Sequence, residues 1–241
     1  MIRRENYINR IRPFMNNDLI KTRFARSLKT YDKNAIVQKQ MAETLLELID
    51  DNFKPKKILE IGSGTGLLTK LVVKHFPNSL FTTNDVVEEC ASFIKQIDSN
   101  IEFLAGDIYN INLKNTYDLI ISNAVFQWFN NPNQILEKLS KNLEKNGLLI
   151  FSSFGEKNFY ELQEIMGIGL NYKILKKPTK EDLITLKFDS LLDLLKHIKY
   201  TGVNAIQEYS FSRKKLESFE KDFYNKYGEI KLTYNPIYYK Y

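Results

Sequence analysis

Three glycines at alternate positions after a short apolar run constrain this chain more than any other feature. Ile58–Ile61 is typical of a buried strand, Gly62, Gly64 and Gly66 follow it, and an apolar helical pattern begins at Leu67. A turn without Cβ atoms lets another molecule lie against the backbone, and the N–H groups at the helix start can bind its polar atoms. At the carboxyl end of the first strand of an open α/β sheet, such a turn predicts a nucleotide-type ligand site.

The spacing of these glycines narrows the class of ligand. The order acid-x-Gly-x-Gly-x-Gly resembles the first motif of class I methyltransferases, which bind S-adenosylmethionine. It differs from the dinucleotide motif G-x-G-x-x-G, because the third glycine comes one residue earlier. The resemblance implies that this segment binds the cofactor through Glu60, Gly62, Ser63, Gly64, Thr65 and Gly66.

Two more acidic positions follow the next predicted strands. Asp85 ends the second strand, where a carboxylate can accept hydrogen bonds from both hydroxyls of a ribose; it can equally cap a helix that begins at Val86. After the third strand, Asp107 can accept from the exocyclic amine of adenine, and Ile108 can pack on the ring. The alternative for Asp107 is an ordinary turn aspartate. A glycine turn and two acids in this order favour a cofactor site that includes Asp85, Val86, Asp107 and Ile108.

The segment after the fourth predicted strand faces the methyl group in a fold of this type. Asn123 can bond near the methionine part of the cofactor or cap the loop. Gln127 and Trp128 are candidates for the acceptor pocket, and core packing is the alternative for Trp128. Enzymes of this fold that methylate amino groups of nucleic acids carry Asn/Asp-Pro-Pro-Tyr/Phe at this place. The absence of those prolines argues against base N-methylation.

Alternating strand and helix patterns predict an α/β protein with a parallel sheet covered by helices on both faces. We expect strands at 57–61, 80–83, 101–104, 117–122 and 148–154, with helices at 67–76, 86–97 and 132–143 and a turn at 146–147. In the last third we expect a helix at 159–170, a strand at 182–188, and a helix at 190–197 capped by Asp189. A helix at 212–227 ended by Gly228 then precedes an edge hairpin strand at 230–239 that is broken near Pro236.

These elements predict one Rossmann-like class I methyltransferase domain. We expect a seven-stranded, mostly parallel sheet with N-terminal helices and a helical lid insertion. The predicted parts are an irregular extension at 1–19, an N-terminal helical region at 20–50, a cofactor-binding core at 56–188, the lid at 189–228 and a C-terminal strand at 229–241.

Composition excludes several kinds of site. The net charge of +6 favours acidic partners such as nucleic acid, an anionic membrane or an acidic protein, and does not choose among them. Cys90 is the one cysteine, and His75 and His197 are far apart, so we expect no disulfide and no metal site. No secretory signal and no membrane-spanning run is found, so a cytoplasmic protein is expected.

The N-terminal pattern carries a closer resemblance. Ile20–Asp32 and then Ala35–Ala42 resemble the N-terminus of the malonyl-acyl-carrier-protein O-methyltransferases of biotin synthesis, with Phe, Tyr-Asp and Val-Gln-x-x-Met-Ala positions at matching spacing. The likeness continues through Asn123–Trp128, Phe151–Gly155 and Thr201–Ala205. It covers almost the whole chain from residue 20, leaves 1–19 outside, and is loose after residue 228.

This resemblance implies methyl transfer to the free carboxylate of a malonyl thioester on acyl carrier protein. A malonyl carboxylate with a pKa near ~4 is ionised at pH 7 and needs no general base. The expected catalytic contribution is therefore alignment rather than proton transfer. The resemblance also implies that Phe24 and Tyr31 close over the cofactor and that Gln38 bonds its carboxylate, with Tyr31 joining the acceptor-pocket candidates; core packing is the alternative for these positions.

An acidic carrier protein would be attracted by a basic surface. The candidate residues are Arg23, Arg26, Lys29, Arg213, Lys214 and Lys215; solvated helix faces are the alternative. We expect a monomer that acts on neither membranes nor nucleic acid. The other functions left open are carboxyl methylation of a small acid of the aconitate type, RNA methylation, and a non-catalytic cofactor-binding subunit.

Overall fold

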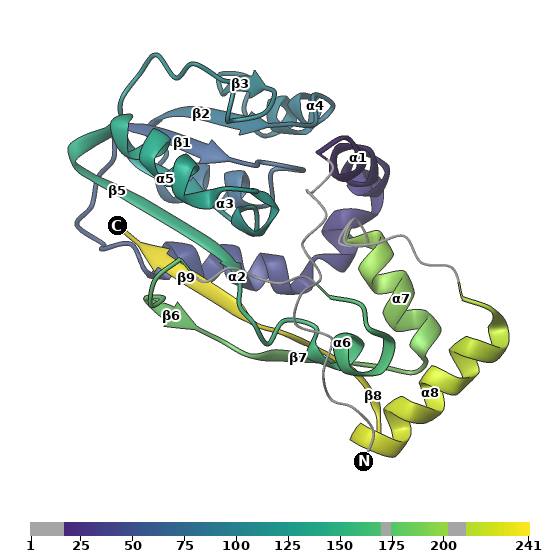
Figure 1. Cartoon of the computed structure of the whole chain (residues 1–241). Helices are drawn as coiled ribbons and strands as arrows, with labels where there is room; N and C mark the ends of the chain where they lie inside the picture. Colours follow the sequence, from purple (N-terminus) through teal and green to yellow (C-terminus); the bar gives the residue numbers. More distant parts are fainter. Residues whose placement is uncertain (1–16, 170–174, 202–210) are drawn as a thin grey trace.

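The computed structural model describes residues 17–169, 175–201 and 211–241 (Figure 1). The first helix, α1 (Asn17–Asn34), begins inside the segment predicted to be an irregular extension, and 1–16 lie outside the described residues. Ala35 separates α1 from α2 (Ile36–Glu47), so the predicted N-terminal helical region consists of two helices.

A seven-stranded sheet forms the centre of the molecule. Its strand order is β3-β2-β1-β4-β5-β9-β6. The bounds are β1 (Lys57–Ile61), β2 (Leu80–Asp85), β3 (Glu102–Ala105), β4 (Tyr117–Ser122), β5 (Leu143–Phe154), β6 (Lys180–Glu181) and β9 (Pro236–Lys240). The first five strands in the order are parallel, and β9 runs antiparallel to both β5 and β6. The predicted seven-stranded, mostly parallel sheet is therefore confirmed.

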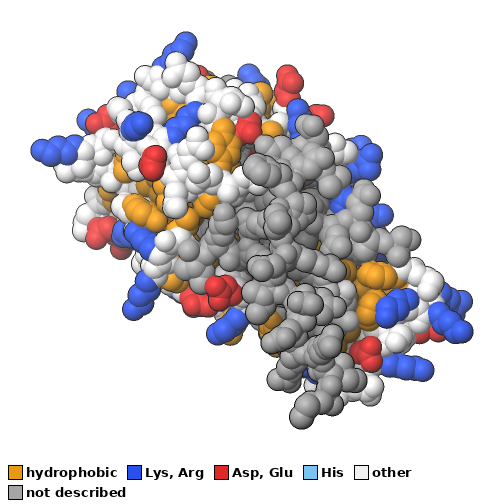
Figure 2. Space-filling model, in the orientation of Figure 1, with side chains coloured by type: hydrophobic (Ala, Val, Ile, Leu, Met, Phe, Trp, Pro, Cys, Tyr) orange, Lys and Arg blue, Asp and Glu red, His pale blue; other side chains and the backbone are white. Residues whose placement is uncertain are grey.

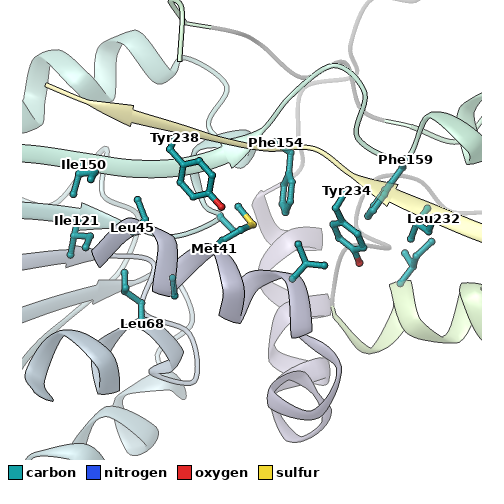
Figure 3. Packing of buried hydrophobic residues seen from close by; sticks show 14 of the residues in the cluster. Met41, Leu45, Leu68, Ile121, Ile150, Phe154, Phe159, Leu232, Tyr234 and Tyr238 are labelled. Carbon is teal, nitrogen blue, oxygen red and sulfur yellow. The ribbon is translucent and has the colours of Figure 1, made fainter. Parts of the chain in front are cut away.

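Helices cover both faces because the central strands are apolar on both sides. Along β4, Leu119 and Ile121 join the core under α2 and α3 (Leu67–His75), whereas Ile120 between them joins the core under α5 (Pro132–Lys141). Successive side chains of a strand point to opposite faces, so one apolar run fills two cores. Figure 3 shows Leu45 of α2 beside Ile121 of this sheet and Met41 of α2 beside Tyr238 of β9.

A second, two-stranded antiparallel sheet extends the first core. It pairs β7 (Ile184–Phe188) with β8 (Ile230–Tyr234) and packs with α6 (Tyr160–Met166), α7 (Leu191–Tyr200) and α8 (Arg213–Tyr227). Tyr234 and Phe159 of this part belong to the same buried cluster as Met41, as Figure 3 shows. The helical insertion between two strands was predicted, but its flanking strands pair with each other instead of both joining the main sheet.

Three local predictions, of a helix cap, a helix start and a strand position, were wrong. Asp189 does not cap the helix that follows: Ser190 is the N-cap, and its hydroxyl accepts from the Asp193 N–H at 3.2 Å. The helix expected from residue 86 begins at Cys90, as α4 (Cys90–Ile97). The strand expected at the sheet edge is split, and its second half, β9, lies between β5 and β6.

The predicted turn at Asn146-Gly147 was also wrong, because both residues lie within β5. The register with β4 shifts there: Tyr117 pairs with Leu143, and Leu119 already pairs with Leu148. The turn-forming residues therefore produce an irregularity inside a long strand rather than its end.

Candidate cofactor and acceptor site

A cavity lies at the carboxyl ends of the parallel strands. Its volume is about 130 Å³, against about 10 Å³ for a second cavity near β9. Its walls come from α1, the glycine turn, the ends of β2 and β3, and the loop after β4. Among the lining residues are Phe24, Leu28, Tyr31, Glu60, Gly62, Ser63, Gly64, Thr65, Asp85, Val86, Asp107, Ile108, Asn123, Val125 and Trp128. Most of the predicted cofactor residues therefore meet in one place.

The three glycines of the turn have different reasons to be glycine. All have positive φ, from +52° to +79°, which L side chains rarely adopt. A Cβ on Gly62 would lie 2.3 Å from Val125 Cγ2, and one on Gly66 would lie 2.3 Å from Ile97 Cδ1. A Cβ on Gly64 would meet nothing within 4 Å. Gly62 and Gly66 thus allow close packing, while the backbone at Gly64 borders open space in which a ligand fits.

Asp85 links the second strand to the glycine turn. Its Oδ2 accepts from the Gly64 N–H and its Oδ1 from the Val87 N–H, both at 2.8 Å. Burial raises the pKa of this carboxyl above its ordinary value, and the backbone hydrogen bonds oppose that rise. The predicted capping role is thus partly observed, at Val87 rather than at a helix start. The carboxylate retains lone pairs that can accept from a ligand hydroxyl.

Glu60 is a second buried acid in the wall of the cavity. It is 1% exposed, and its Oε2 accepts from the Thr69 hydroxyl at 2.7 Å. Burial, together with the nearby charge of Asp85, raises the pKa of Glu60 from 4.5 to about 8, although the Thr69 hydrogen bond lowers it. A buried acid of this kind favours a cationic ligand group beside it, because the cation would stabilise the ionised form.

The residues predicted to contact adenine lie in the loop after β3. Asp107 accepts through Oδ1 from the Tyr109 N–H at 3.0 Å, which is the turn role that sequence alone left open. Ile108 is buried in the core under α5 and also lines the cavity. Both residues therefore serve the fold and still border the space in which a ligand would lie.

Helix α1 is hydrogen-bonded to the glycine turn. Asp32 accepts from the Thr65 hydroxyl at 2.5 Å and lies 3.4 Å from Lys70 Nζ. The Phe24 ring lies 5.9 Å from that of Tyr31. Burial and the neighbouring Asp32 and Asp85 carboxylates raise the pKa of Tyr31, so its phenol stays protonated. Asp32 was not among the predicted site residues, although it belongs to the Tyr-Asp pair of the family pattern.

The loop after β4 uses most of its polar groups to hold itself in place. Asn123 Nδ2 donates to the Gln38 carbonyl at 2.8 Å, and its Oδ1 accepts from the Ser152 hydroxyl at 2.6 Å. Gln127 Nε2 donates to the Ala124 carbonyl at 2.5 Å, and Gln127 lines the smaller cavity instead of the larger one. Gln38 is also not part of the larger cavity's lining. Of the two acceptor candidates in this loop, only Trp128 borders the larger cavity.

The basic candidates lie on two helices. Arg26 and Lys29 of α1 are exposed, as are Arg213, Lys214 and Lys215 at the start of α8. Arg213 pairs with Glu217 at 3.1 Å. Figure 1 shows α7 between α1 and α8, and Figure 2 shows Lys and Arg side chains around the end of the molecule formed by α8.

Within the parts of the chain that the structure describes, no helix is long and apolar enough to cross a membrane. The same residues contain no group of three or more His, Cys, Asp or Glu side chains that could hold a metal ion.

Known proteins that are similar to this chain are methyltransferases, in keeping with a cofactor cavity at the carboxyl ends of the strands. A family model described as a methyltransferase domain matches residues 33–208. The chain is 37% identical to a malonyl-[acyl-carrier protein] O-methyltransferase of Calditerrivibrio nitroreducens, over 91% of this chain and 94% of the relative. It is 31% identical to a protein of the same name from Haemophilus influenzae, over 91% and 92%. A solved structure of a proposed methyltransferase from Bacillus halodurans C-125 shares the fold, with a TM-score of 0.57, 13% identity and coverage of 83% of this chain and 96% of that one.

Proposed function

The chain belongs to the malonyl-[acyl-carrier protein] O-methyltransferase family, and from this membership we propose that it methylates the free carboxylate of a malonyl thioester on acyl carrier protein. The methyl donor is S-adenosylmethionine, which supplies an electrophilic methyl group on a sulfonium centre. The observation that carries the proposal is the cavity in which the glycine turn, Asp85, Asp107 and Trp128 meet.

The residues of the cavity fit this cofactor. The open backbone at Gly64 leaves room for it, Asp85 would accept from the ribose hydroxyls, and Asp107 and Ile108 would hold the adenine. The buried Glu60 carboxyl would receive the cationic amino group of the methionine part. Phe24 and Tyr31 would cover the bound cofactor from α1.

The proposed reaction requires no proton transfer by the protein. A malonyl carboxylate is already ionised at neutral pH, so its oxygen can attack without a general base. None of the described lining residues is a histidine. The contribution of the chain is to hold the carboxylate oxygen in line with the methyl group and to keep water out, which α1 does by closing against the glycine turn. Methylation removes the terminal charge of the acyl group, in keeping with the role in biotin synthesis that the resemblance implies.

The carrier protein would approach over the basic residues of α1 and α8. The candidates on these helices are Arg23, Arg26, Lys29, Arg213, Lys214 and Lys215. All of these side chains except the half-buried Arg23 are exposed, so their charges suit a partner of opposite charge, and salt would weaken the approach. A cytoplasmic monomer is part of the same proposal.

Methyl transfer from labelled S-adenosylmethionine to a panel of acceptors tests the proposal. The panel contains malonyl-acyl carrier protein, malonyl-coenzyme A, aconitate and RNA. Label should enter the malonyl carrier protein at the highest kcat/KM. Preferential labelling of aconitate would favour the small-acid function, and labelling of RNA would favour an RNA methyltransferase.

Charge reversal tests the docking surface separately. Changing Lys214 and Lys215 to Glu should lower kcat/KM for the malonyl carrier protein and leave that for malonyl-coenzyme A unchanged, if the latter is turned over at all. The matched control changes Lys141 and Lys145 to Glu; both are exposed near the amino end of β5, away from the cavity at the carboxyl ends of the strands. Equal effects of the two pairs would contradict the proposed surface.

A further inference from the structure

The indole N–H of Trp128 is a hydrogen-bond donor without a partner. Trp128 ends the short helix η1 (Phe126–Trp128) and borders the larger cavity. Its Nε1 is buried and meets no acceptor among the described residues. An indole N–H can only donate, and buried donors in folded proteins are nearly always paired. An unpaired donor in the wall of a ligand cavity points to a partner that the ligand supplies.

The strand order indicates which part of the ligand this is. β2 and β3 lie on one side of β1 and carry Asp85 and the loop with Asp107; β4, which leads to Trp128, lies on the other side. The loop after β4 also reaches the loop after β3, where the Phe129 and Tyr109 rings lie 5.8 Å apart. Trp128 itself contacts Phe24 of α1 and follows β4, on the other side of β1 from the strands that lead to Asp85 and Asp107. With the ribose and adenine at those two acids, the methyl group and the incoming acceptor are expected on the side of β1 that carries Trp128.

Contacts on two sides orient the indole ring. The backbone N–H of Trp128 donates to the Val125 carbonyl at 2.8 Å, and Val125 is packed against Gly62. The Trp128 ring meets Phe24 of α1 edge to face, with centroids 6.2 Å apart and planes at 86°. The indole ring is thus packed between the glycine turn and the helix that covers the site.

Among the described residues, the wall of the cavity offers no cationic side chain to a carboxylate. None of the described lining residues is Lys, Arg or His, whereas Glu60, Asp85 and Asp107 all contribute acidic side chains. Within the described wall, neutral donors are therefore the candidates for holding an anionic acceptor. Asn123 uses both polar atoms of its side chain within the protein, so it is a poor candidate. Two described side chains of the wall have a buried, unused donor, the Ser63 hydroxyl and the Trp128 indole. Ser63 belongs to the glycine turn assigned to the cofactor, so Trp128 is the candidate for the acceptor.

We propose that Trp128 donates a hydrogen bond from Nε1 to the malonyl carboxylate, at the oxygen that does not accept the methyl group. This inference rests on the proposed function. The bond to an anion is charge-assisted, so it favours a carboxylate over a neutral acyl end. The proton stays on the indole: the attacking oxygen forms the new O–C bond, and the electrons of the broken C–S bond remain on sulfur. Trp128 is a substrate-positioning residue that contributes no acid or base.

The composition of the chain allows a sharp test, because Trp128 is its one tryptophan. Expression in a tryptophan auxotroph supplied with benzothienylalanine replaces the indole N–H by sulfur at this position alone and keeps the ring shape. KM for the malonyl carrier protein should rise roughly 10- to 100-fold, with the affinity for S-adenosylhomocysteine unchanged. Circular dichroism and melting of the substituted protein check that it is folded.

Each result decides the matter. An unchanged KM in the substituted protein would overturn the inference and leave the proposed function intact. A loss of S-adenosylhomocysteine affinity would also overturn it, because the N–H would then serve the cofactor. Failure of the unmodified protein to methylate the malonyl carrier protein would instead remove the proposed function, and the inference with it.

A measurement on the unmodified protein covers the case in which the analogue does not fold. Since the Trp128 nitrogen is buried, an acceptor must uncover it to bind, and the emission of this one tryptophan should shift when the malonyl carrier protein is added to the S-adenosylhomocysteine complex. The matched acetyl carrier protein, which lacks the carboxylate, should give a smaller shift. Equal shifts for the two carriers would contradict the proposal.

Discussion

Changing Glu60 to Gln should make the cofactor-free protein less sensitive to alkaline pH. Glu60 is fully enclosed at the end of β1, and burial raises its pKa from 4.5 to about 8. The folded state therefore binds this proton more tightly than the unfolded state. The stability that depends on it is complete below pH 4.5 and is lost as the pH rises toward 8.

The two pKa values give the size of the effect. Full ionisation of Glu60 in the folded state costs about 5 kcal/mol relative to the unfolded chain, at about 1.4 kcal/mol for each tenfold change in proton affinity. Between pH 6 and pH 8 alone, the loss is about 2 kcal/mol. Gln cannot ionise, so the variant should keep that increment.

The assay is urea unfolding of both proteins at pH 6 and pH 8. The free energy of unfolding of the wild type should fall by about 2 kcal/mol more than that of Glu60→Gln. Glu43→Gln removes a similar charge from an exposed site on α2 and serves as the matched control. Saturating S-adenosylhomocysteine should narrow the gap, because its amino group would pair with the ionised acid. Parallel pH dependence in the wild type and Glu60→Gln would refute the reasoning.

Three further predictions follow from contacts in the site. Gly62→Ala should lower the free energy of urea unfolding by about 2–4 kcal/mol, because at φ +74° its Cβ would lie 2.3 Å from Val125 Cγ2. Adding Val125→Ala in the same chain should restore part of that loss. Gly62→Ala protein as stable as the wild type would contradict this. Asp32→Ala removes the hydrogen bonds of α1 to Thr65 and Lys70. Calorimetry should show that S-adenosylhomocysteine binds roughly 3- to 10-fold more weakly, while the free energy of unfolding changes by less than about 1 kcal/mol. Unchanged affinity would argue against α1 as a cover of the cofactor site. Asp85→Asn should weaken the same binding roughly 10- to 100-fold, and tight binding by this variant would exclude the ribose role.

The fold was predictable where the chain repeats a strong local pattern. β1 and β4 were predicted with their observed bounds, because their apolar runs suit strands buried on both faces. The helix predicted at 212–227 is present as α8, and Gly228 ends it in the left-handed conformation as expected, because such a glycine acts within one turn. Elements that depend on distant partners were harder: β6 has two residues and exists because β9 pairs with it.

The site was predictable in its cofactor half and less so in its acceptor half. Gly62, Asp85 and Asp107 follow three neighbouring parallel strands, so their meeting is a consequence of topology. The roles of Asp32 and of the Trp128 N–H depend on how α1 and the loop after β4 pack against each other. No spacing in the sequence encodes that contact. The same holds for Gln127, whose side chain turns back to its own loop.

Intact mass measurement of malonyl-acyl carrier protein, after incubation with the purified chain and S-adenosylmethionine, tests whether this chain methylates the malonyl carboxylate. We expect a gain of one methyl group that mild base removes, as is typical of an ester, and no gain on the acetyl carrier protein. A preparation that binds S-adenosylhomocysteine yet leaves the malonyl carrier protein unchanged, or methylates both carriers alike, would contradict the proposed activity.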